Sequence, residues 1–268
     1  MLKRRTFIKF ISSFAGGALL GGIAYGYQSN RIEIHREKII CPAIAHRLRI
    51  VAVSDIHAPQ FPGSDGTLVD LINSQKPDIC IFAGDIIDQA NNETLVREFH
   101  AIQSSLTKIA VLGNWEYLSK LNLQKLRREY HKAGIRLLIN ESFRIGPLCI
   151  FGADDLVEGS FDCKIIQHTP RDESPLTLLV SHCPAIMDDL NHDFPFLIIS
   201  GHTHGGQIAP FGLALITPPG SGDYVRGWYH KGNTAMYVMK GIGTTPGMPL
   251  RIGCKPEIFV LDLENFAN

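Results

Sequence analysis

Two stretches of the chain decide its fold, RIVAVSDIH at residues 49–57 and DICIFAGDIID at residues 78–88. Each begins with a short apolar run rich in β-branched residues, which is typical of a buried strand, and ends in polar residues. The pattern recurs in KIAVLGNWE at residues 108–116. The spacing from one run to the next, about thirty residues, is that of a strand, a crossing helix and a second, parallel strand. This alternation predicts an α/β fold.

The second half of the chain continues the alternation with more strand and less helix. It predicts two packed mixed sheets with helices outside, a four-layer α/β/β/α sandwich. In one helical stretch Leu123, Leu126 and Tyr130 fall three or four residues apart and form an apolar stripe. The predicted strands are 49–54, 78–83, 108–112, 135–139, 148–151, 176–181, 196–200, 235–240 and 257–263. The predicted helices are 67–75, 93–105 and 119–133.

The composition is that of an ordinary globular protein. The chain has 268 residues, 45% of them hydrophobic and 19% charged, which excludes a disordered or fibrous protein. Residues 1–49 carry nine basic and two acidic residues, whereas the remainder carries 17 basic and 24 acidic residues. A net-negative body argues against a nucleic-acid partner and suits a protein that collects cations. We expect one domain in this body, and a monomer.

The six cysteines are scattered and form no closely spaced pair. This spacing favours buried structural thiols over a metal or disulfide framework. Cys183 lies beside one of the motifs described below, but the sequence has no potential general base at a characteristic spacing from it. A catalytic thiol is therefore not favoured.

The N-terminal segment has the pattern of a targeting or anchoring sequence. The basic stretch MLKRRTFIK at residues 1–9 precedes eighteen uncharged residues at 10–27, FISSFAGGALLGGIAYGY. A helix of that length spans about 27 Å, just enough for a bilayer core. The stretch RRTFIK at residues 4–9 also resembles the twin-arginine export signal. A plain membrane anchor and a twin-arginine signal both stay open, as does cleavage of the segment.

These observations divide the chain into three parts. We expect a signal or membrane anchor at residues 1–27, a tether or edge strand at 28–47, and the folded body at 48–264. The protein is then either attached to a bacterial cytoplasmic membrane through residues 10–27 or exported by the twin-arginine route. The side of the membrane on which the body lies stays undecided.

Potential metal ligands follow five of the apolar runs. In an open α/β sheet, ligands bind in the crevice beyond the carboxyl ends of the strands. Side chains alternate along a strand, so Asp55 and His57 face one way, as do His202 and His204 if the extended chain continues. A single zinc takes three or four ligands, whereas two adjacent ions bridged by a carboxylate suit a larger mixed set. The seven candidate ligands are Asp55, His57, Asp85, Asn114, His182, His202 and His204.

The motifs DIH, GDIID, GNWE, SHCP and GHTH occur in this order along the chain. The set resembles the pattern D-x-H, G-D-x-x-D, G-N-H-[DE], a lone H and G-H-x-H of the calcineurin-like metallophosphoesterase superfamily. The stretches GHTHGGQI, GWYHKGNTAMYVMKGIGTT and PEIFVLDL are also similar to one branch of that superfamily. This branch contains twin-arginine-exported phosphodiesterases and a membrane-attached UDP-2,3-diacylglucosamine diphosphatase. The resemblance covers residues 48–264.

The resemblance implies a two-metal site in which Asp85 bridges the ions and a metal-bridging hydroxide attacks phosphorus. It implies manganese as the metal, with iron and zinc as alternatives. The implied ligands of the first ion are Asp55, His57, Asp85 and His204, and those of the second are Asp85, Asn114, His182 and His202. The implied catalytic candidates are Asp88, which orients a ligand, together with Trp115 and Glu116 of the GNWE motif.

Trp115 departs from the family pattern, which has a histidine at this position. An indole N–H donates a hydrogen bond but does not transfer a proton near pH 7. An alkoxide leaving group needs a proton, whereas a phosphate leaving group does not. Trp115 therefore favours a diphosphate or another activated leaving group. The alternative is that a different residue, His230 or Tyr224, supplies the proton.

Residues 208–219, IAPFGLALITPP, are apolar for a loop beside a polar site. Either they cover the cleft and receive an acyl chain, or they form a strand and turn of the second sheet. The function predicted is hydrolysis of a phosphodiester or diphosphate bond, with UDP-2,3-diacylglucosamine or another lipid-linked or small phosphorylated molecule as substrate. The alternative is a membrane-tethered metal-binding or cell-wall-interaction protein whose site is inactive.

Overall fold

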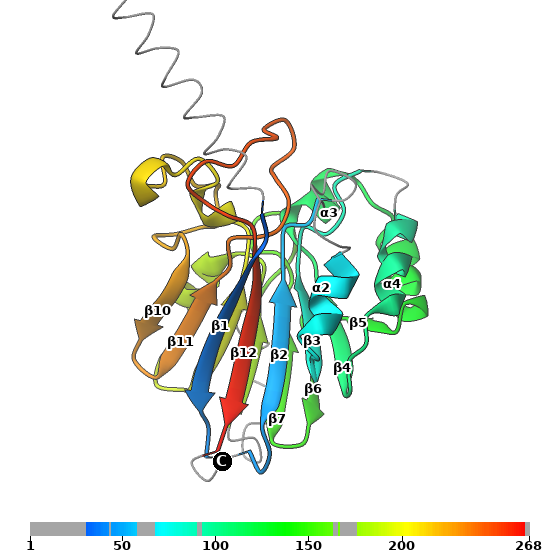
Figure 1. The fold of residues 1–268 in the computed structure, drawn as a ribbon, viewed down its shortest axis with the longest axis vertical. Coiled ribbons are helices and arrows are strands. Elements are labelled where there is room, and N and C mark those ends of the chain that lie inside the picture. The colour runs from blue at the N-terminus through cyan, green and yellow to red at the C-terminus, as the bar shows by residue number, and fades with distance from the viewer. Residues whose placement is uncertain are drawn as a thin grey trace, which may run out of the picture.

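Two six-stranded sheets pack face to face (Figure 1). The predicted signal or anchor at residues 1–27 lies outside the residues that the structure describes. Within the described part of the chain, no helix is both long and apolar enough to traverse a bilayer. The prediction of an α/β fold with two mixed sheets is confirmed. The computed structural model describes residues 31–42, 44–57, 68–89, 93–162, 166 and 176–265.

The first sheet is mostly parallel. In sheet order its strands are β1 (Glu33–Ile40), β12 (Glu257–Glu264), β2 (Leu48–Val53), β3 (Ile79–Ala83), β4 (Thr107–Val111) and β5 (Ile135–Leu137). Neighbouring strands from β2 to β5 run parallel, whereas β12 runs antiparallel to β2. β1 precedes residue 48, yet it forms the edge of this sheet because it pairs with β12 over its full length.

The second sheet has antiparallel strands only at its edges. In sheet order its strands are β10 (Gly227–Lys231), β11 (Thr234–Val238), β9 (Phe196–Ser200), β8 (Leu176–Val180), β7 (Leu148–Gly152) and β6 (Glu141–Ile145). The four inner strands β11, β9, β8 and β7 run parallel to one another. The edge strands β10 and β6 each run antiparallel to their neighbour. The edge strands β1, β6 and β10 keep many side chains exposed or half-buried, so their sequences contain no long apolar run to predict them.

Helices cover the outer face of the first sheet (Figure 1). They are α2 (Leu68–Ser74), the 3₁₀ helix η1 (Glu93–Ala101) and α4 (Leu123–Lys132), whereas the short helix α3 (Asn114–Leu118) lies at the top of the molecule, beyond the end of β4. The helix predicted over 93–105 ends early, because the carbonyls at its end accept hydrogen bonds from the side chains of Lys108 and Asn73. The helix predicted over 119–133 begins only where Asn122 caps the first turn of α4.

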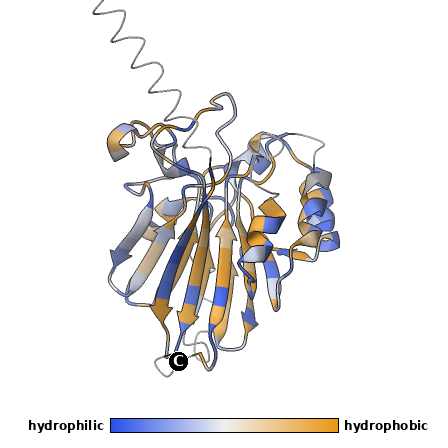
Figure 2. Cartoon of the chain, in the orientation of Figure 1, coloured by the Kyte–Doolittle hydropathy of each residue, from blue (hydrophilic) through white to orange (hydrophobic). Residues whose placement is uncertain are grey.

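Three apolar clusters hold the layers together. One fills the space between the sheets and includes Ile81 and Phe259. A second lies between the first sheet and its helices and buries Leu126 and Tyr130 of the predicted stripe. The third lies on the outer face of the second sheet, where Met187 of the 3₁₀ helix η2 (Pro184–Asp189) packs. The strands of Figure 2 are mostly hydrophobic for this reason, and the packing fixes both sheets against each other.

Cysteines form no disulfide among the described residues. The Cys183 thiol donates a hydrogen bond to Asp155 Oδ2 over 3.1 Å. Burial and the Asp155 charge raise the pKa of this thiol, so it stays protonated. The buried, unpaired cysteines are Cys41, Cys80, Cys149, Cys183 and Cys254.

Candidate metal centre

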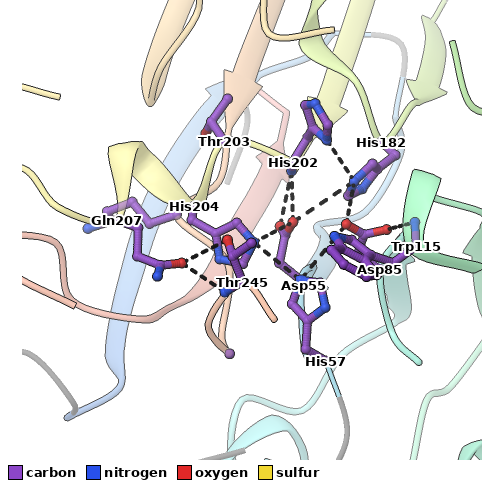
Figure 3. A network of polar contacts seen from close by, with 12 residues as sticks. Asp55, His57, Asp85, Trp115, His182, His202, Thr203, His204, Gln207 and Thr245 are labelled. Carbon is purple, nitrogen blue, oxygen red and sulfur yellow. Dashed lines mark hydrogen bonds and ion pairs between the residues drawn. The ribbon is translucent and has the colours of Figure 1, made fainter. Parts of the chain in front are cut away.

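Polar residues from five strands meet at one edge of the molecule (Figure 3). The strands β2, β3 and β4 of the first sheet and β8 and β9 of the second all end there. His204 follows slightly later, at the start of the 3₁₀ helix η3 (His204–Gly206). The structure therefore brings together side chains that are far apart in the sequence. The residues that follow the five strands are Asp55, Asp85, Asn114, His182 and His202.

The first cluster of potential ligands consists of Asp55, His57 and His204. All three are buried, and their ligand atoms lie within 4.8 Å of one another. His57 Nε2 lies 3.2 Å from His204 Nε2, and the two rings stack with their centroids 5.1 Å apart. His204 Nε2 is also 3.5 Å from Asp55 Oδ1. Imidazole nitrogens and a carboxylate that converge in this way suit a divalent first-row metal.

The second cluster consists of Asp85, His182 and His202, which are also buried and converge within the same 4.8 Å. His182 Nε2 lies 3.1 Å from Asp85 Oδ2 and 3.1 Å from His202 Nδ1. The two imidazole rings meet edge to face. This cluster has the same chemistry as the first, two imidazoles and one carboxylate.

The Asp85 carboxylate lies between the two clusters. Its Oδ2 atom is 3.1 Å from His182 Nε2 in the second cluster and 3.8 Å from His57 Nε2 in the first. Asp55 Oδ1 approaches the second cluster less closely, at 4.0 Å from His182 Nε2. Asp85 is therefore the carboxylate best placed to be shared by two ions.

Asn114 provides an independent test of whether the site fits a cation. Its Oδ1 atom is buried and has no hydrogen-bond partner among the residues that the structure describes. An unsatisfied buried carbonyl oxygen costs about 1–3 kcal/mol, so it calls for an explanation. Amide oxygens are metal ligands, and the next residue, Trp115, donates its backbone N–H to Asp85, so Asn114 is a candidate ligand for an ion held by the second cluster.

The backbone adopts a left-handed conformation at five of the seven candidate ligands. The φ angles are +52° at Asp55, +50° at His57, +54° at Asp85, +73° at His202 and +49° at His204. Such left-handed conformations cost non-glycine residues about 1–3 kcal/mol each and are typical of functional sites. The extended chain therefore does not continue past β9. The alternation expected for His202 and His204 fails, and the two histidines enter different clusters.

Backbone carbonyls orient the histidines of the second cluster. The Nδ1 atom of His182 lies 2.8 Å from the carbonyl oxygen of Ala83, and Nε2 of His202 lies 2.7 Å from that of Pro219. Each carbonyl accepts a hydrogen bond, so these nitrogens carry the protons. His182 Nε2 and His202 Nδ1 are then the nitrogens with a lone pair for a metal.

The carboxylates of the two clusters carry negative charge that the other side chains around them do not balance. Protonated histidines are needed to balance it. Burial would lower the pKa of His182, but the Asp85 and Asp55 carboxylates raise it well above the ordinary value. The same histidine, opposing the effect of burial, lowers the pKa of Asp85 to about 2. Divalent cations would take over this role and displace the imidazole protons.

Arg251, which no sequence motif singled out, contacts the first cluster on the Nδ1 side of the His204 ring. Its side chain is fully buried, and its Nη2 atom lies 3.3 Å from His204 Nδ1. Further donors bond the carbonyls of Gly243 and Lys240. Burial, His57 and Arg251 lower the pKa of His204 well below its usual range, so this ligand is kept neutral. No local pattern marks Arg251, because its loop is neither a strand nor a helix.

Asp88 lies next to the first cluster without joining it. Its Oδ2 atom is 3.5 Å from His57 Nδ1, on the side of the ring opposite to Nε2. Together with Asp85 and Asp55, Asp88 raises the pKa of His57 against the effect of burial. This position is suited to orienting His57 rather than to touching a substrate.

Glu116, a catalytic candidate from the sequence, faces the backbone. Its carboxylate is fully buried and accepts hydrogen bonds from the N–H groups of Asp85, Ile86, Ile87 and Gly113, over 2.7–3.2 Å. Burial and the nearby Asp85 charge raise its pKa to about 7. Glu116 therefore shapes the turn that carries Asp85 and has no oxygen left for a substrate.

Trp115 lies beside the first cluster. Its ring meets that of His57 edge to face, with centroids 6.1 Å apart, and its backbone N–H donates to Asp85 Oδ1 over 2.8 Å. The two substitute proton donors are bonded elsewhere. The Tyr224 hydroxyl donates to Asp188 over 2.6 Å, and His230 is exposed on β10, stacked on Trp228.

Comparison with known proteins places this geometry in a family. Residues 48–206 match the model of the calcineurin-like phosphoesterase family. The "Uncharacterized metallophosphoesterase YkuE" of Bacillus subtilis (strain 168) is 31% identical, with 98% of each chain covered. The "Uncharacterized metallophosphoesterase YkoQ" of the same organism is 30% identical over 79% of this chain and 82% of its own. A "Transmembrane protein with metallophosphoesterase domain" of Bos taurus is 28% identical over 87% of this chain and 56% of its own.

The family match covers more than half of the chain, and all five motifs lie within it. The structure adds two clusters of potential metal ligands. The chain belongs to the calcineurin-like phosphoesterase family and is a metal-dependent phosphoester hydrolase.

Proposed function

We propose that this protein hydrolyses a phosphodiester or diphosphate bond with the help of two divalent cations. The observation that carries the proposal is the position of Asp85 Oδ2, which lies 3.1 Å from a histidine of one cluster and 3.8 Å from a histidine of the other. Two ions bound side by side supply a water molecule of lowered pKa and neutralise the oxygens of a phosphate group. Manganese is the proposed metal, with iron and zinc as the alternatives to test.

The chain's own residues hold and orient this centre. Asp88 Oδ2 lies 3.5 Å from Nδ1 of His57, on the side of the ring away from the cluster, and Glu116 accepts hydrogen bonds from the turn that carries Asp85. Buried ligands with fixed partners exclude competing water and need little rearrangement when the cations bind. The proposed ligands are Asp55, His57, Asp85 and His204 for one ion, and Asp85, Asn114, His182 and His202 for the other.

The presence of Trp115 in place of a proton donor favours a substrate whose leaving group needs no proton. The indole ring of Trp115 contacts the ring of His57 edge to face. The Tyr224 hydroxyl donates to Asp188 and His230 stacks on Trp228, so neither is oriented to act as the general acid. Without an acid, departure of an alkoxide is slow, because acid assistance contributes about 10²–10⁴-fold. A diphosphate bond, which releases a phosphate group, suits this site better.

A lipid-linked diphosphate such as UDP-2,3-diacylglucosamine is the proposed substrate class. Large apolar side chains are exposed beside the centre, among them Phe211 and Ile216. The uncharged residues 10–27 are long enough for a membrane anchor. A relative from Bos taurus is named as a transmembrane protein.

The experiment uses the purified full chain. Bound metal is quantified, and rates are compared for a nitrophenyl diester, an alkyl monoester and UDP-linked diphosphates, with Asp85→Asn as the inactive control. Two ions per chain and hydrolysis of the diphosphates are expected. Tight metal binding without turnover of any of these substrates would instead support the alternative, a tethered metal-binding protein with an inactive site.

Location is tested separately. We propose that residues 1–27 attach the protein to the membrane or direct its export by the twin-arginine route. Arg4→Lys together with Arg5→Lys keeps the positive charge, to which a plain anchor responds. Loss of export in this variant supports the twin-arginine signal, whereas unchanged membrane attachment supports the plain anchor.

A further inference from the structure

Exposed apolar side chains are concentrated on two loops beside the metal centre. Among the described residues, eleven large apolar side chains are exposed, and six of them lie on these loops. The first loop follows η3 and contains the 3₁₀ helix η4 (Pro210–Gly212), and the second joins β11 to β12. We call these six side chains the apolar rim: Phe211, Leu213, Leu215, Ile216, Met248 and Leu250.

Gln207 joins the two loops into one surface. Its Nε2 atom donates to the carbonyls of Met248 and Leu250, over 2.7 and 3.2 Å, and its Oε1 atom accepts from the backbone N–H of Thr245 over 2.9 Å. Gln207 and Thr245 are seen in Figure 3 next to His204. The rim is therefore attached directly to a residue that lies three positions after a candidate metal ligand.

The first loop presents Phe211 in a fixed, strained conformation. The φ angle of Phe211 is +55°, which is unfavourable for an aromatic residue, and its side chain is 99% exposed. The guanidinium of Arg226 donates to the carbonyls of Gly205 and Gly212, on both sides of this turn. The fold thus holds a large apolar ring out into solvent.

The N-terminal strand enters the fold at this same edge. The backbone N–H of Glu33, the first residue of β1, donates to the Pro256 carbonyl over 2.8 Å. Pro256 ends the second rim loop just before β12. In Figure 1 the start of β1 lies at the top of the molecule, where the loops following β9 and β11 project beyond the strands. The uncharged residues 10–27 therefore precede the entry of the chain beside the rim.

We propose that the apolar rim docks into the surface of a lipid bilayer. Clustered exposed apolar side chains mark an interaction site, and an apolar face of this kind enters about 5–10 Å into the boundary between headgroups and acyl chains. A bilayer is the occupant because the apolar N-terminal run leads to the same edge. Docking in this way turns the metal centre toward lipid headgroups. This inference is independent of whether the centre hydrolyses lipid-linked diphosphates.

Tryptophan fluorescence of the full chain tests the proposal. Phe211→Trp and, in a second variant, Ile216→Trp each place a reporter on the rim, and neither residue belongs to the metal centre. The variants are mixed with phosphatidylcholine vesicles whose acyl chains carry bromine, which quenches nearby indoles. The matched control is Leu106→Trp, an exposed apolar position just before β4, at the amino end of this strand and so at the end of the sheet away from the metal centre.

The expected result is a blue shift and loss of the emission added at positions 211 and 216, with no loss of that added at position 106. Equal quenching at all three positions overturns the proposal, as does vesicle-bound protein whose rim reporters are unquenched. Protein that stays in solution overturns it as well. If the reporters are shielded without vesicles and the protein mass doubles, the rim is an interface between two copies instead.

Discussion

The guanidinium of Arg251 lies 3.3 Å from Nδ1 of His204, and both side chains are buried. The nitrogen on the other side of the ring, Nε2, faces His57 and Asp55. Arg251 therefore fixes the orientation of one ligand in the first cluster and of none in the second.

Arg251→Lys is expected to weaken the binding of one ion by about 10–100-fold, which is typical of partners that orient a metal ligand. Lysine keeps the charge but lacks the planar group that reaches His204, Gly243 and Lys240 together. Metal titration of chelator-treated protein measures both affinities. Arg226→Lys is the control, because among the described residues the Arg226 guanidinium donates to the backbone carbonyls of Gly205 and Gly212 and not to a side chain of either cluster. Equal weakening of both ions would contradict the specific role of Arg251.

Asn114→Ala is expected to leave about one ion per chain when metal is limiting. The variant removes the buried Oδ1 atom, which has no hydrogen-bond partner among the described residues and is the proposed ligand of the second ion. Metal analysis after dialysis measures the content. Asn122→Ala, which removes the cap of α4, is the control that affects stability alone. Two tightly held ions in the Asn114 variant would refute its role.

Glu116→Gln is expected to lower the free energy of unfolding by about 1–3 kcal/mol and to weaken both ions. The amide has one acceptor oxygen in place of two, so N–H groups around Asp85 lose their partner. Denaturant unfolding and metal titration measure the two effects. The exposed Glu158→Gln serves as the matched control. A Glu116 variant with normal metal affinity but no turnover would point to a direct catalytic role.

Trp115→His is expected to accelerate the hydrolysis of alkyl phosphates and to change nitrophenyl and diphosphate substrates little. General acid assistance contributes about 10²–10⁴-fold where the leaving group needs a proton. Comparison of kcat/KM over leaving groups of different pKa measures this, with Trp115→Phe as the control. If native protein cleaves alkyl and activated substrates equally well, another group supplies the proton.

Stability in acid is expected to depend on Glu129, which joins α4 to η1. Hydrogen bonds from Arg97 and Lys132 lower its pKa from 4.5 to about 2. The depressed pKa means that Glu129 contributes stability above pH 4.5, and that this contribution is lost as the pH falls toward 2. Thermal unfolding between these values measures the loss. Glu129→Gln should lose less stability over the same range, and identical pH profiles would rule this pairing out.

The sequence by itself determined the α/β architecture and most strand positions. Strands such as β3 and β9 are buried along their whole length, so nearly every position is apolar and the pattern is visible locally. The edge strands β6 and β10 escaped prediction because half-burial leaves no such run, whereas β1 lies within residues 28–47, where a tether or an edge strand was expected. Their positions depend on pairing with partners elsewhere in the chain, and β1 pairs with β12 more than two hundred residues away.

The sequence also identified the side chains that converge on the centre, because each follows an apolar run directly. Only the tertiary structure decided how they are grouped. His202 and His204 enter separate clusters because the backbone adopts left-handed φ angles after β9, which strand alternation does not anticipate. The contact of Arg251 with His204 and the backbone bonds of Glu116 depend on burial and on neighbours distant in sequence, neither of which a local motif encodes.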